Sequence, residues 1–320
     1  MRIAVDVMGG DYAPVELIAG AVKWIEKNDT KLILVGRQEV IEEELKQYTF
    51  QAERLEIVNA REVVGMDESP TTAMRKKKDS SIAVANRLVQ EKRADALVSC
   101  GSTGAQMTAA IFVLGRLEGI ERPPIVAEIP NISGKSSFLI DVGANVDCRP
   151  RQLLQFAVLA SAYASISQGL ENPRVALLNN GEEESKGNKL SLDTYALLRE
   201  TSKLNFIGNI EGRDLFTDKS DIIVCDGFMG NIILKSMEGM AMFMAGAIAR
   251  ELGRLPDFFN NFDYTRVGGA PLLGVNGVSV VCHGSSKREA VCNGIRIAVD
   301  CVRNDIVKMQ QRGLEGTREA

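Results

Sequence analysis

The chain has 320 residues, of which 45% are hydrophobic, so it can bury a large core without disulfide bonds or a structural metal. Its formal net charge of −4 does not support a general role in binding nucleic acid. The six cysteines form no C-x-x-C pair and stand mostly in apolar segments, which indicates a reducing compartment. We therefore expect a cytoplasmic protein with no metal and no cofactor.

Strand and helix patterns alternate through the first third of the chain. A strand over Arg2–Val7 ends in the turn Met8–Asp11, and a helix starts near Pro14, a residue suited to a first helical turn. The elements expected next are a strand at Lys31–Val35, a helix at Glu39–Gln47, a strand at Leu55–Val58 and a helical region at Thr71–Glu91, broken or bent near Asp79–Ser81. This alternation predicts a parallel, doubly wound sheet with helices on both faces.

The stretch Ala94–Leu114 combines a strand, a small-residue turn and an apolar helix. The strand is expected at Ala94–Ser99, the turn at Gly101–Gly104 and the helix at Ala105–Leu114. Glycines, hydroxyls and the N–H groups of a helix start favour an anion, and phosphate is the natural ligand. In the equally weighted alternative, Ser102 or Thr103 only caps the helix.

The pattern changes after this stretch. Strand-like runs at Ile125–Ile129 and Ser137–Val142 are separated by only a few residues, which predicts an antiparallel hairpin. The elements expected after it are a helix at Arg151–Ser167, a strand at Arg174–Leu178, a polar loop at Asn179–Asn188, a helix at Lys189–Thr201, strands at Leu204–Ile210 and Asp221–Cys225, a helix at Asn231–Leu252, one or two strands at Pro271–Cys282 and a closing helix at Ser285–Gln311.

The whole chain is expected to form one compact α/β domain over residues 1–320. Two lobes dividing near residue 119 are the alternative, and a polar, frayed tail is expected at Arg312–Ala320. The uninterrupted apolar stretch Gly239–Ala249 is too short to span a bilayer, so we expect no transmembrane segment.

Small or polar residues follow several of the predicted strands, at Asp141–Asn145, Asn179–Gly181, Asp226–Asn231 and His283–Ser286. In an open α/β sheet, ligands bind outside the carboxyl ends of the strands, so these loops could form one site. Each loop taken alone is more readily explained by ordinary turn chemistry.

Two side chains in these loops could take part in chemistry. His283, the only histidine, could act as a general base, a phosphate ligand or a donor to an oxyanion, and a structural role is as frequent. Lys186 is a cation among carboxylates, and it could contact a phosphate or a thioester oxygen. The alternative for Lys186 is a surface ion pair of little energetic value.

Several common site types are missing from the sequence. There is no G-x-G-x-x-G fingerprint, no G-x-S-x-G elbow and no Cys/His/Asp cluster at zinc-ligand spacing. Gly134–Ser136 resembles the tail of a P-loop, but Ile129 stands where its first glycine should be. Acyl transfer from a thioester to phosphate remains attractive because it needs mainly positioning and oxyanion stabilisation.

Two further features suggest partners. The basic run Arg75, Lys76, Lys77 and Lys78 would suit an acidic protein, although a solvated helix face is the commoner explanation. The stretch from Leu255 to Phe262 places three phenylalanines in a Pro- and Asn-containing loop. Such a loop contacts a second subunit, contacts a membrane or packs within its own subunit.

Seven motifs together resemble the bacterial acyl-acyl-carrier-protein:phosphate acyltransferases of phospholipid synthesis. They are Val5–Asp11, Ser99–Ala105, Asp141–Asn145, Asn180–Glu183 with Lys186–Gly187, Asn209–Asp214, Asp226–Asn231 and His283–Ser286. The resemblance runs from about Arg2 to Gln311. The chain departs from the family pattern at Cys100 and Ser102, which stand at positions that we associate with Ala and often Asn in this family. The resemblance therefore leaves open which side chain touches the phosphate.

The resemblance implies transfer of a long-chain fatty acyl group from acyl-carrier protein to inorganic phosphate, giving acyl phosphate for a membrane glycerol-3-phosphate acyltransferase. It implies a mostly parallel, doubly wound fold similar to phosphotransacetylases and to isocitrate and isopropylmalate dehydrogenases. It also implies a homodimer, with the Met-rich helix and the tip Leu255, Phe258, Phe259 and Phe262 at the dimer interface and at the membrane, and hence a cytoplasmic, peripherally membrane-associated enzyme. Our own inference adds Arg75–Lys78 as a dock for the acidic carrier protein.

The site hypothesis that follows assigns phosphate binding to Gly101, Ser102, Thr103 and Gly104. Lys186 and His283 are the expected catalytic residues, and with Asn180 and Asn231 they would surround the thioester carbonyl. Asp141, Asn145 and Ser285 complete the expected substrate-binding residues. The alternatives are a short-chain phosphotransacetylase using acyl-CoA, a decarboxylating dehydrogenase on a related fold and a non-catalytic membrane-associated scaffold.

Overall fold

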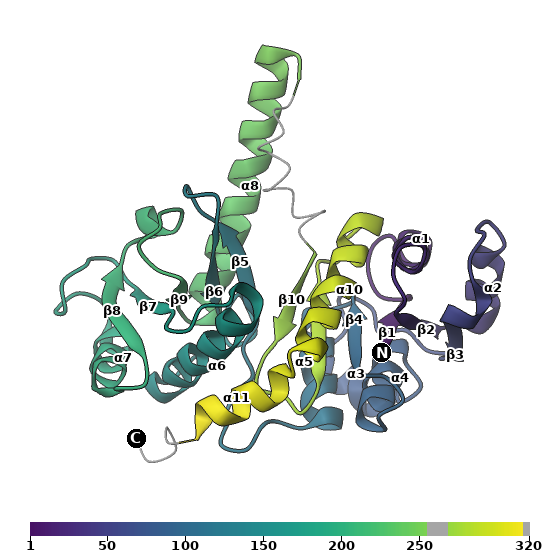
Figure 1. Ribbon diagram of the computed structural model, residues 1–320, viewed down its shortest axis with the longest axis horizontal. Coiled ribbons are helices and arrows are strands. Elements are labelled where there is room, and N and C mark those ends of the chain that lie inside the picture. Colours follow the sequence, from purple (N-terminus) through teal and green to yellow (C-terminus); the bar gives the residue numbers. More distant parts are fainter. Residues whose placement is uncertain (255–267, 316–320) are drawn as a thin grey trace. The chain divides into compact units, whose positions relative to one another are not determined.

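The computed structural model describes residues 1–254 and 268–315, and the chain divides into two compact units. Unit 1 comprises Met1–Gly115 and Ile248–Arg303, and unit 2 comprises Arg116–Ala247 and Asn304–Ala320. Each unit contains its own sheet, so two sheets stand where the alternation predicted one (Figure 1). Both sheets are mostly parallel and carry helices, which confirms the predicted α/β class.

Unit 1 is built on six strands, β1 (Arg2–Asp6), β2 (Lys31–Gly36), β3 (Leu55–Asn59), β4 (Ala96–Ser99), β10 (Gly269–Leu272) and β11 (Val278–Cys282). Their order is β10-β11-β4-β1-β2-β3, and only the β10–β11 pair is antiparallel. The four middle strands are almost entirely buried, as is typical of a parallel sheet covered on both faces. Consequently β11, β4 and β1 end side by side.

The helices of unit 1 are α1 (Val15–Ile25), α2 (Gln38–Leu45), α3 (Pro70–Lys76), α4 (Ser81–Gln90), α5 (Thr103–Ala109) and α10 (Arg288–Arg303). The predicted helical region Thr71–Glu91 is thus two helices, because Lys77 leaves the helical conformation and Ser80 is extended. Helix α5 starts two residues earlier than predicted and continues as one π-helical turn over Ala110–Leu114.

Unit 2 is built on five strands, β5 (Val126–Pro130), β6 (Ser136–Ile140), β7 (Arg174–Leu178), β8 (Asn205–Ile210) and β9 (Ile222–Val224). Their order is β5-β6-β9-β7-β8. The β5–β6 pair is antiparallel, which confirms the predicted hairpin, and the other pairs are parallel. The helices that start in unit 2 are α6 (Pro150–Gln168), α7 (Lys189–Glu200), α8 (Gly227–Leu252) and α11 (Ile306–Leu314).

The predicted closing helix Ser285–Gln311 is wrong. Helix α10 ends at Arg303, and Asp305 adopts the left-handed conformation with φ of 51°, which a continuous helix does not allow. The predicted frayed tail is also wrong at its start, because residues 312–314 belong to α11, and residues 316–320 lie outside the described residues. Hydrophobic periodicity continues across the break, so the pattern alone could not reveal it.

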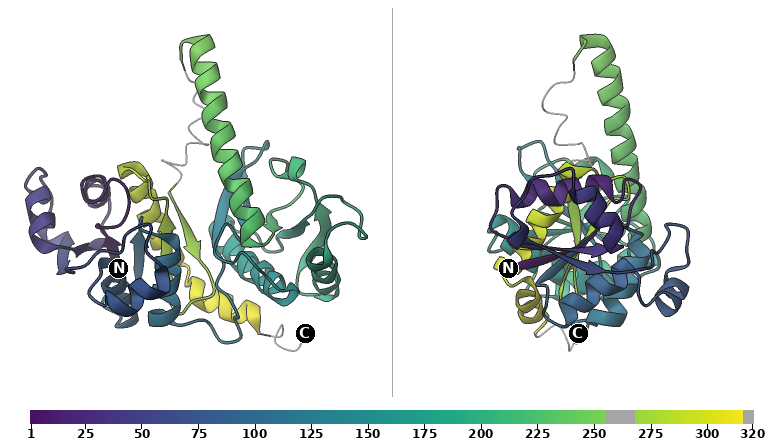
Figure 2. Two further views of the ribbon diagram at one scale, coloured as in Figure 1. Left: turned by 180° about the vertical axis from the view of Figure 1, so that it is seen from behind. Right: turned by 90° about the vertical axis from the view of Figure 1, so that its right-hand side faces the viewer.

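Helix α8 is continuous over 26 residues and begins one turn before the predicted start (Figure 2). Only Gly227 and Gly230 are buried, and Met240, Met242 and Phe243 are more than half exposed. By length and composition alone, with a mean hydropathy of 1.4, α8 could cross a membrane. The prediction that no apolar segment is long enough to span a bilayer considered only residues 239–249. It is corrected for length, because α8 has 26 residues.

Candidate active site

Three loops of unit 1 follow the adjacent strands β1, β4 and β11. We call them the Met8 loop (residues 8–11), the glycine loop (residues 101–104) and the histidine loop (residues 283–286). Because parallel strands end at the same edge of a sheet, the three loops come together although they lie far apart in the sequence. Of the loops that the sequence pattern grouped, the glycine and histidine loops thus lie at one edge of the unit 1 sheet, and a shared ligand site stays a prediction.

Direct backbone contacts connect the three loops. The Asp11 N–H donates to the Gly284 carbonyl at 2.8 Å, which joins the Met8 loop to the histidine loop. A Cβ on Gly9 would lie 2.8 Å from Gly101 Cα, so no larger residue fits there. Gly10 has φ of +111°, and its Cβ would lie 3.0 Å from the carbonyl oxygens of Cys100 and Gly284. Glycine is thus required for the loops to pack this closely.

The glycine loop offers backbone donors more than side chains. Ser102 is the N-cap of α5, and its Oγ accepts from Ala105 N–H at 3.5 Å. The capping role considered for Ser102 is therefore present in the structure. Within the described residues, the N–H groups of Ser102, Thr103 and Gly104 have no hydrogen-bond acceptor. Free N–H groups at a helix start are suited to an anion such as phosphate.

The histidine loop orients the ring of His283. The Ser285 N–H donates to His283 Nδ1 at 3.1 Å, and the Ser285 hydroxyl lies 2.7 Å from the same nitrogen. Since Nδ1 accepts this backbone proton, the neutral ring carries its own proton on Nε2. His283 is exposed, and in this tautomer Nε2 is a hydrogen-bond donor rather than a base.

In unit 2, Asp141 and Asn145 form a buried cluster at the end of β6. The Asp141 carboxylate accepts from the N–H groups of Ile125, Ala144 and Asn145 at 2.7–3.1 Å and from Asn145 Nδ2 at 2.9 Å. Burial raises the pKa of Asp141, and these hydrogen bonds act against that shift. The two side chains hold the turn after β6, and substrate binding by them stays a prediction.

Lys186 lies in the exposed loop between β7 and α7. Two of the three glutamates in this loop already have cationic partners, since Glu182 pairs with Lys219 at 2.9 Å and Glu184 with Arg199 at 2.9 Å. Lys186 Nζ forms no ion pair within the described part of the chain, although three glutamates precede it. The surface ion pair considered as its alternative role is therefore not what the structure contains.

A cavity of about 240 Å³ in unit 2 adjoins the same loop. Polar residues on its lining include Asn179, Asn180, Asn188, Ser191 and Asp226. Apolar residues on it include Leu153, Leu177, Leu178, Leu190 and Met229. The predicted residue Asn180 thus lines a cavity. Asn231 contacts the β6 turn instead, since its Nδ2 donates to Val142 O at 3.4 Å.

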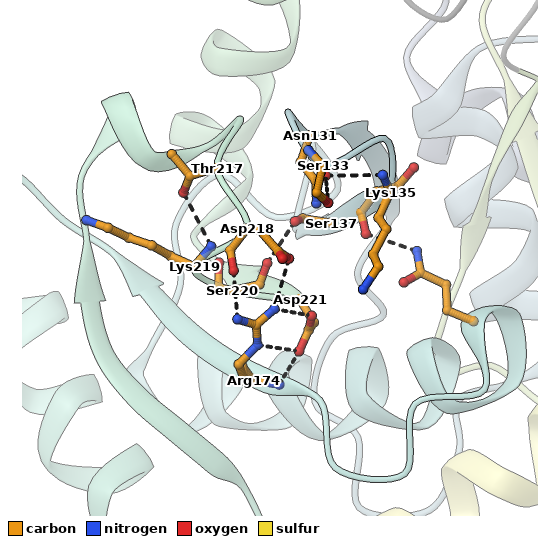
Figure 3. Close-up of polar contacts among 12 residues, drawn as sticks. Asn131, Ser133, Lys135, Ser137, Arg174, Thr217, Asp218, Lys219, Ser220 and Asp221 are labelled. Atoms are coloured by element: carbon orange, nitrogen blue, oxygen red, sulfur yellow. Dashed lines mark hydrogen bonds and ion pairs between the residues drawn. The ribbon is translucent and has the colours of Figure 1, made fainter.

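A polar network fixes the β5–β6 hairpin (Figure 3). The segment Gly134–Ser136, which resembles a P-loop tail, belongs to this hairpin. Asn131 Oδ1 accepts from Ser133 N–H at 3.1 Å and from Lys135 N–H at 3.2 Å, so these donors are occupied within the turn. Nearby, Arg174 pairs with Asp221 at 2.8 Å and with Asp218 at 3.1 Å. This cluster therefore stabilises the fold of unit 2 and does not form a phosphate site.

The basic run Arg75–Lys78, at the end of α3 and directly after it, is only partly available to a partner. Lys77 Nζ donates to Val63 O at 2.8 Å and pairs with Glu68 at 2.5 Å, so it is engaged inside unit 1. Arg75, Lys76 and Lys78 are exposed. Across the described ranges, no three His, Cys, Asp or Glu side chains are placed to hold a metal ion.

Comparison with known proteins identifies the family of this chain. A family model described as fatty acid synthesis protein matches residues 1–309. A phosphate acyltransferase of Syntrophomonas wolfei subsp. wolfei is 66% identical over 312 residues, covering 97% of this chain and 98% of that protein. Another, of Heliobacterium modesticaldum, is 51% identical over 334 residues and covers 100% and 99%. The chain belongs to the phosphate acyltransferase family. It is an acyltransferase, and the resemblance carried by the seven motifs is confirmed.

Solved structures extend the comparison at the level of fold. A phosphotransacetylase of Streptococcus pyogenes has a TM-score of 0.66 at 18% identity, covering 95% of this chain and 94% of that one. The EutD phosphotransacetylase of Staphylococcus aureus has a TM-score of 0.63 at 17% identity, covering 94% of both chains. The predicted likeness to the phosphotransacetylase fold is confirmed.

The predicted membrane tip, Leu255, Phe258, Phe259 and Phe262, lies outside the described residues. Asp6 and Ser99, in contrast, are buried beneath the loops of unit 1, and no role was predicted for either. A carboxylate at the end of an otherwise apolar strand was the signal that could have drawn attention to Asp6.

Proposed function

We propose that this acyltransferase moves a long-chain fatty acyl group from acyl-acyl-carrier protein to inorganic phosphate. The observation that carries the proposal is the group of unoccupied N–H donors at the glycine loop, next to the histidine loop. Inorganic phosphate is small and anionic, so a few fixed donors suffice to hold it. The relatives named phosphate acyltransferase support phosphate as the acceptor.

The reaction requires little acid–base catalysis from the protein. A phosphate oxygen attacks the thioester carbonyl carbon, and the carbonyl oxygen becomes an oxyanion. The C–S bond then breaks, so that the carrier leaves as a thiolate and acyl phosphate remains. Because phosphate is already anionic and the thiolate leaves readily, positioning and oxyanion stabilisation are the main contributions.

Within this scheme the glycine loop binds phosphate through backbone N–H groups, and His283 donates through Nε2 to an anionic oxygen. Lys186 supplies an unpaired positive charge to an anionic oxygen of the substrate. The cavity beside it in unit 2 is assigned to part of the acyl donor, with Asn180 on its lining. The expectation that Lys186, His283, Asn180 and Asn231 surround one thioester carbonyl involves residues of both units, and it stays a prediction.

The acyl-carrier protein is proposed to dock on the exposed cations at the end of α3 and directly after it. Arg75, Lys76 and Lys78 are free of the contacts that engage Lys77, so they can attract an acidic partner. The double change Arg75→Glu with Lys76→Glu should raise the KM for acyl-acyl-carrier protein and leave that for phosphate unchanged. An unchanged KM for the carrier would move the dock elsewhere.

Helix α8 is proposed to pack against a second copy of the chain, with the Leu255–Phe262 tip at the membrane surface. The exposed Met240, Met242 and Phe243 support this proposal, because so much apolar surface on one helix is unusual for an isolated chain. The enzyme would then be a cytoplasmic homodimer that associates peripherally with the membrane and delivers acyl phosphate there. Liposome co-sedimentation that survives Phe258→Asp with Phe259→Asp would contradict the membrane part.

Mass spectrometry of the products tests the reaction itself. Purified protein is mixed with palmitoyl-acyl-carrier protein and phosphate, and acetyl-CoA with phosphate serves as the parallel reaction. We expect phosphate-dependent palmitoyl phosphate and free carrier protein, with little acetyl phosphate. Acetyl phosphate alone would indicate a short-chain phosphotransacetylase, and no product in either reaction would favour a non-catalytic scaffold.

A further inference from the structure

Asp6 is bonded directly to the Met8 loop of unit 1 and, through Ser99, to the glycine loop. It is the last residue of β1 and the register partner of Ser99 at the end of β4. The Ser99 hydroxyl donates to Asp6 Oδ2 at 2.8 Å, and Gly101 N–H donates to Ser99 Oγ at 3.1 Å. On the other side, Met8 N–H donates to Asp6 Oδ1 at 3.1 Å.

We propose that Asp6 is a positioning residue that sets the glycine loop for phosphate binding through Ser99. The proposal rests on the assignment of phosphate to the glycine loop. Asp6 does not touch phosphate in this scheme, because the residue is only 2% exposed. It fixes the hydroxyl of Ser99, that hydroxyl fixes Gly101 N–H, and the following N–H groups keep their direction.

The packing leaves little room for an alternative arrangement of these groups. Ser99 has no exposed surface, and a Cβ on Gly9 would lie 3.0 Å from Asp6 Oδ2. One carboxylate is therefore bonded to the Met8 loop and, through one hydroxyl, to the first residue of the glycine loop. Such a chain of bonds holds backbone donors within the narrow limits that a binding site needs.

The cost of burying Asp6 also points to a role beyond stability. In the described parts of unit 1 no Lys, Arg or His forms an ion pair with it. Burial raises the pKa of Asp6, and hydrogen bonds from Ser81, Ser99, Met8 and Gly9 act in the opposite direction. A buried carboxylate without a cation is unfavourable for folding, and groups of this kind are frequent at functional sites.

A double-mutant cycle tests the connection. We expect Asp6→Ala and Ser99→Ala each to raise the KM for phosphate about tenfold or more, with a smaller change in kcat. Since both changes break the same chain of bonds, the double variant should have a phosphate KM within about twofold of the worse single variant. KM changes that multiply, or a phosphate KM that stays at the wild-type value, would overturn the proposal.

Two further variants separate positioning from stability. Asn86→Ala removes another fully buried polar side chain of unit 1, whose Nδ2 donates to Ile82 O at 2.8 Å, without touching the loops. It should lower the melting temperature and leave the phosphate KM unchanged. Asp6→Asn keeps an acceptor for Met8 N–H and an amide that can donate to Ser99, so its phosphate KM should lie between wild type and Asp6→Ala.

Activity and binding measurements together distinguish a failure of the Asp6 positioning role from a failure of the proposed reaction. A wild-type protein that makes no phosphate-dependent acyl phosphate would contradict the reaction. Phosphate binding measured by calorimetry on the full chain then still reports whether Asp6 and Ser99 act together. A wild-type protein that makes acyl phosphate, with an unchanged phosphate KM in Asp6→Ala and Ser99→Ala, would contradict only the positioning role.

Discussion

Each unit has a buried aspartate at the end of one strand of its sheet, Asp6 as the last residue of β1 and Asp141 directly after β6, but the two carboxylates organise different structures. Asp6 of unit 1 is bonded to Ser99, 93 residues away, and so connects loops from different parts of the chain. Asp141 of unit 2 is bonded to Ala144 and Asn145, only three and four residues away, and to Ile125, sixteen residues away. The first carboxylate joins separate loops, whereas the second mainly shapes its own turn.

This difference fits two kinds of ligand. Interlocked glycine loops can hold fixed N–H donors around a small anion, and their close packing tolerates little change. In unit 2 an exposed polar loop and a partly apolar cavity leave room for a larger and more variable group. We infer that phosphate recognition depends on rigidity in unit 1, and that donor recognition depends on surface residues in unit 2.

The largest expected effect is on the stability of unit 2. A Cβ on Gly230 would overlap the Asp141 carbonyl oxygen and lie 2.9 Å from Cys225 Sγ, so Gly230→Ala should lower the free energy of unfolding by about 3 kcal/mol. Gly239→Ala in the same helix is the control, because a Cβ there would meet no atom of another element within 4 Å. It should stabilise the protein by up to about 1 kcal/mol. Equal stabilities of the two variants in urea and thermal unfolding would contradict the packing at Asp141.

Lys186 provides the sharpest test of the exposed loop in unit 2. If its charge stabilises an oxyanion, Lys186→Ala should lower kcat/KM about a hundredfold, which corresponds to about 2.7 kcal/mol. Lys189→Ala is matched to it, since Lys189 is also exposed but pairs with Asp193 at 2.8 Å. Lys189→Ala should leave the rate within about twofold of wild type. An unchanged rate in Lys186→Ala at saturating phosphate would remove its catalytic role.

The strands and the loops after them could be predicted from the sequence. The contacts between distant parts of the chain could not, for physical reasons. Buried apolar runs such as Val175–Leu178 mark strands, and small residues after them mark the loops. The pairing of β11 with β4 joins residues about 180 positions apart. The ion pair between Lys77 and Glu68 forms only once the surrounding loop has folded. Local pattern carries no information on such contacts. The change of pattern along the chain indicated two lobes dividing near residue 119 as an alternative, but no local pattern indicated that residues 248–303 return to unit 1.

His283 tests the histidine loop with a smaller expected effect. Because its Nδ1 accepts from Ser285 N–H, its proposed contribution is one donated hydrogen bond from Nε2. His283→Ala should lower kcat/KM about tenfold, and His283→Gln, whose amide can also donate, should recover part of that loss. A loss in His283→Gln as large as in His283→Ala would point to proton transfer by the ring instead.

The smallest expected effect concerns the scaffold that supports the unit 1 loops. Arg288, at the start of α10, holds Glu16 of α1 through a pair at 2.6 Å, and this lowers the pKa of Glu16 from 4.5 to about 2. A lowered pKa means that the folded state favours the charged form, so the pair stabilises the protein above about pH 4.5 and this stability disappears toward pH 2. Because Arg288 is half exposed, Glu16→Gln should cost only about 1 kcal/mol at pH 7. Urea unfolding at pH 7 and at progressively lower pH should show the difference from wild type shrinking, and a difference that does not depend on pH would exclude the ion pair as its cause.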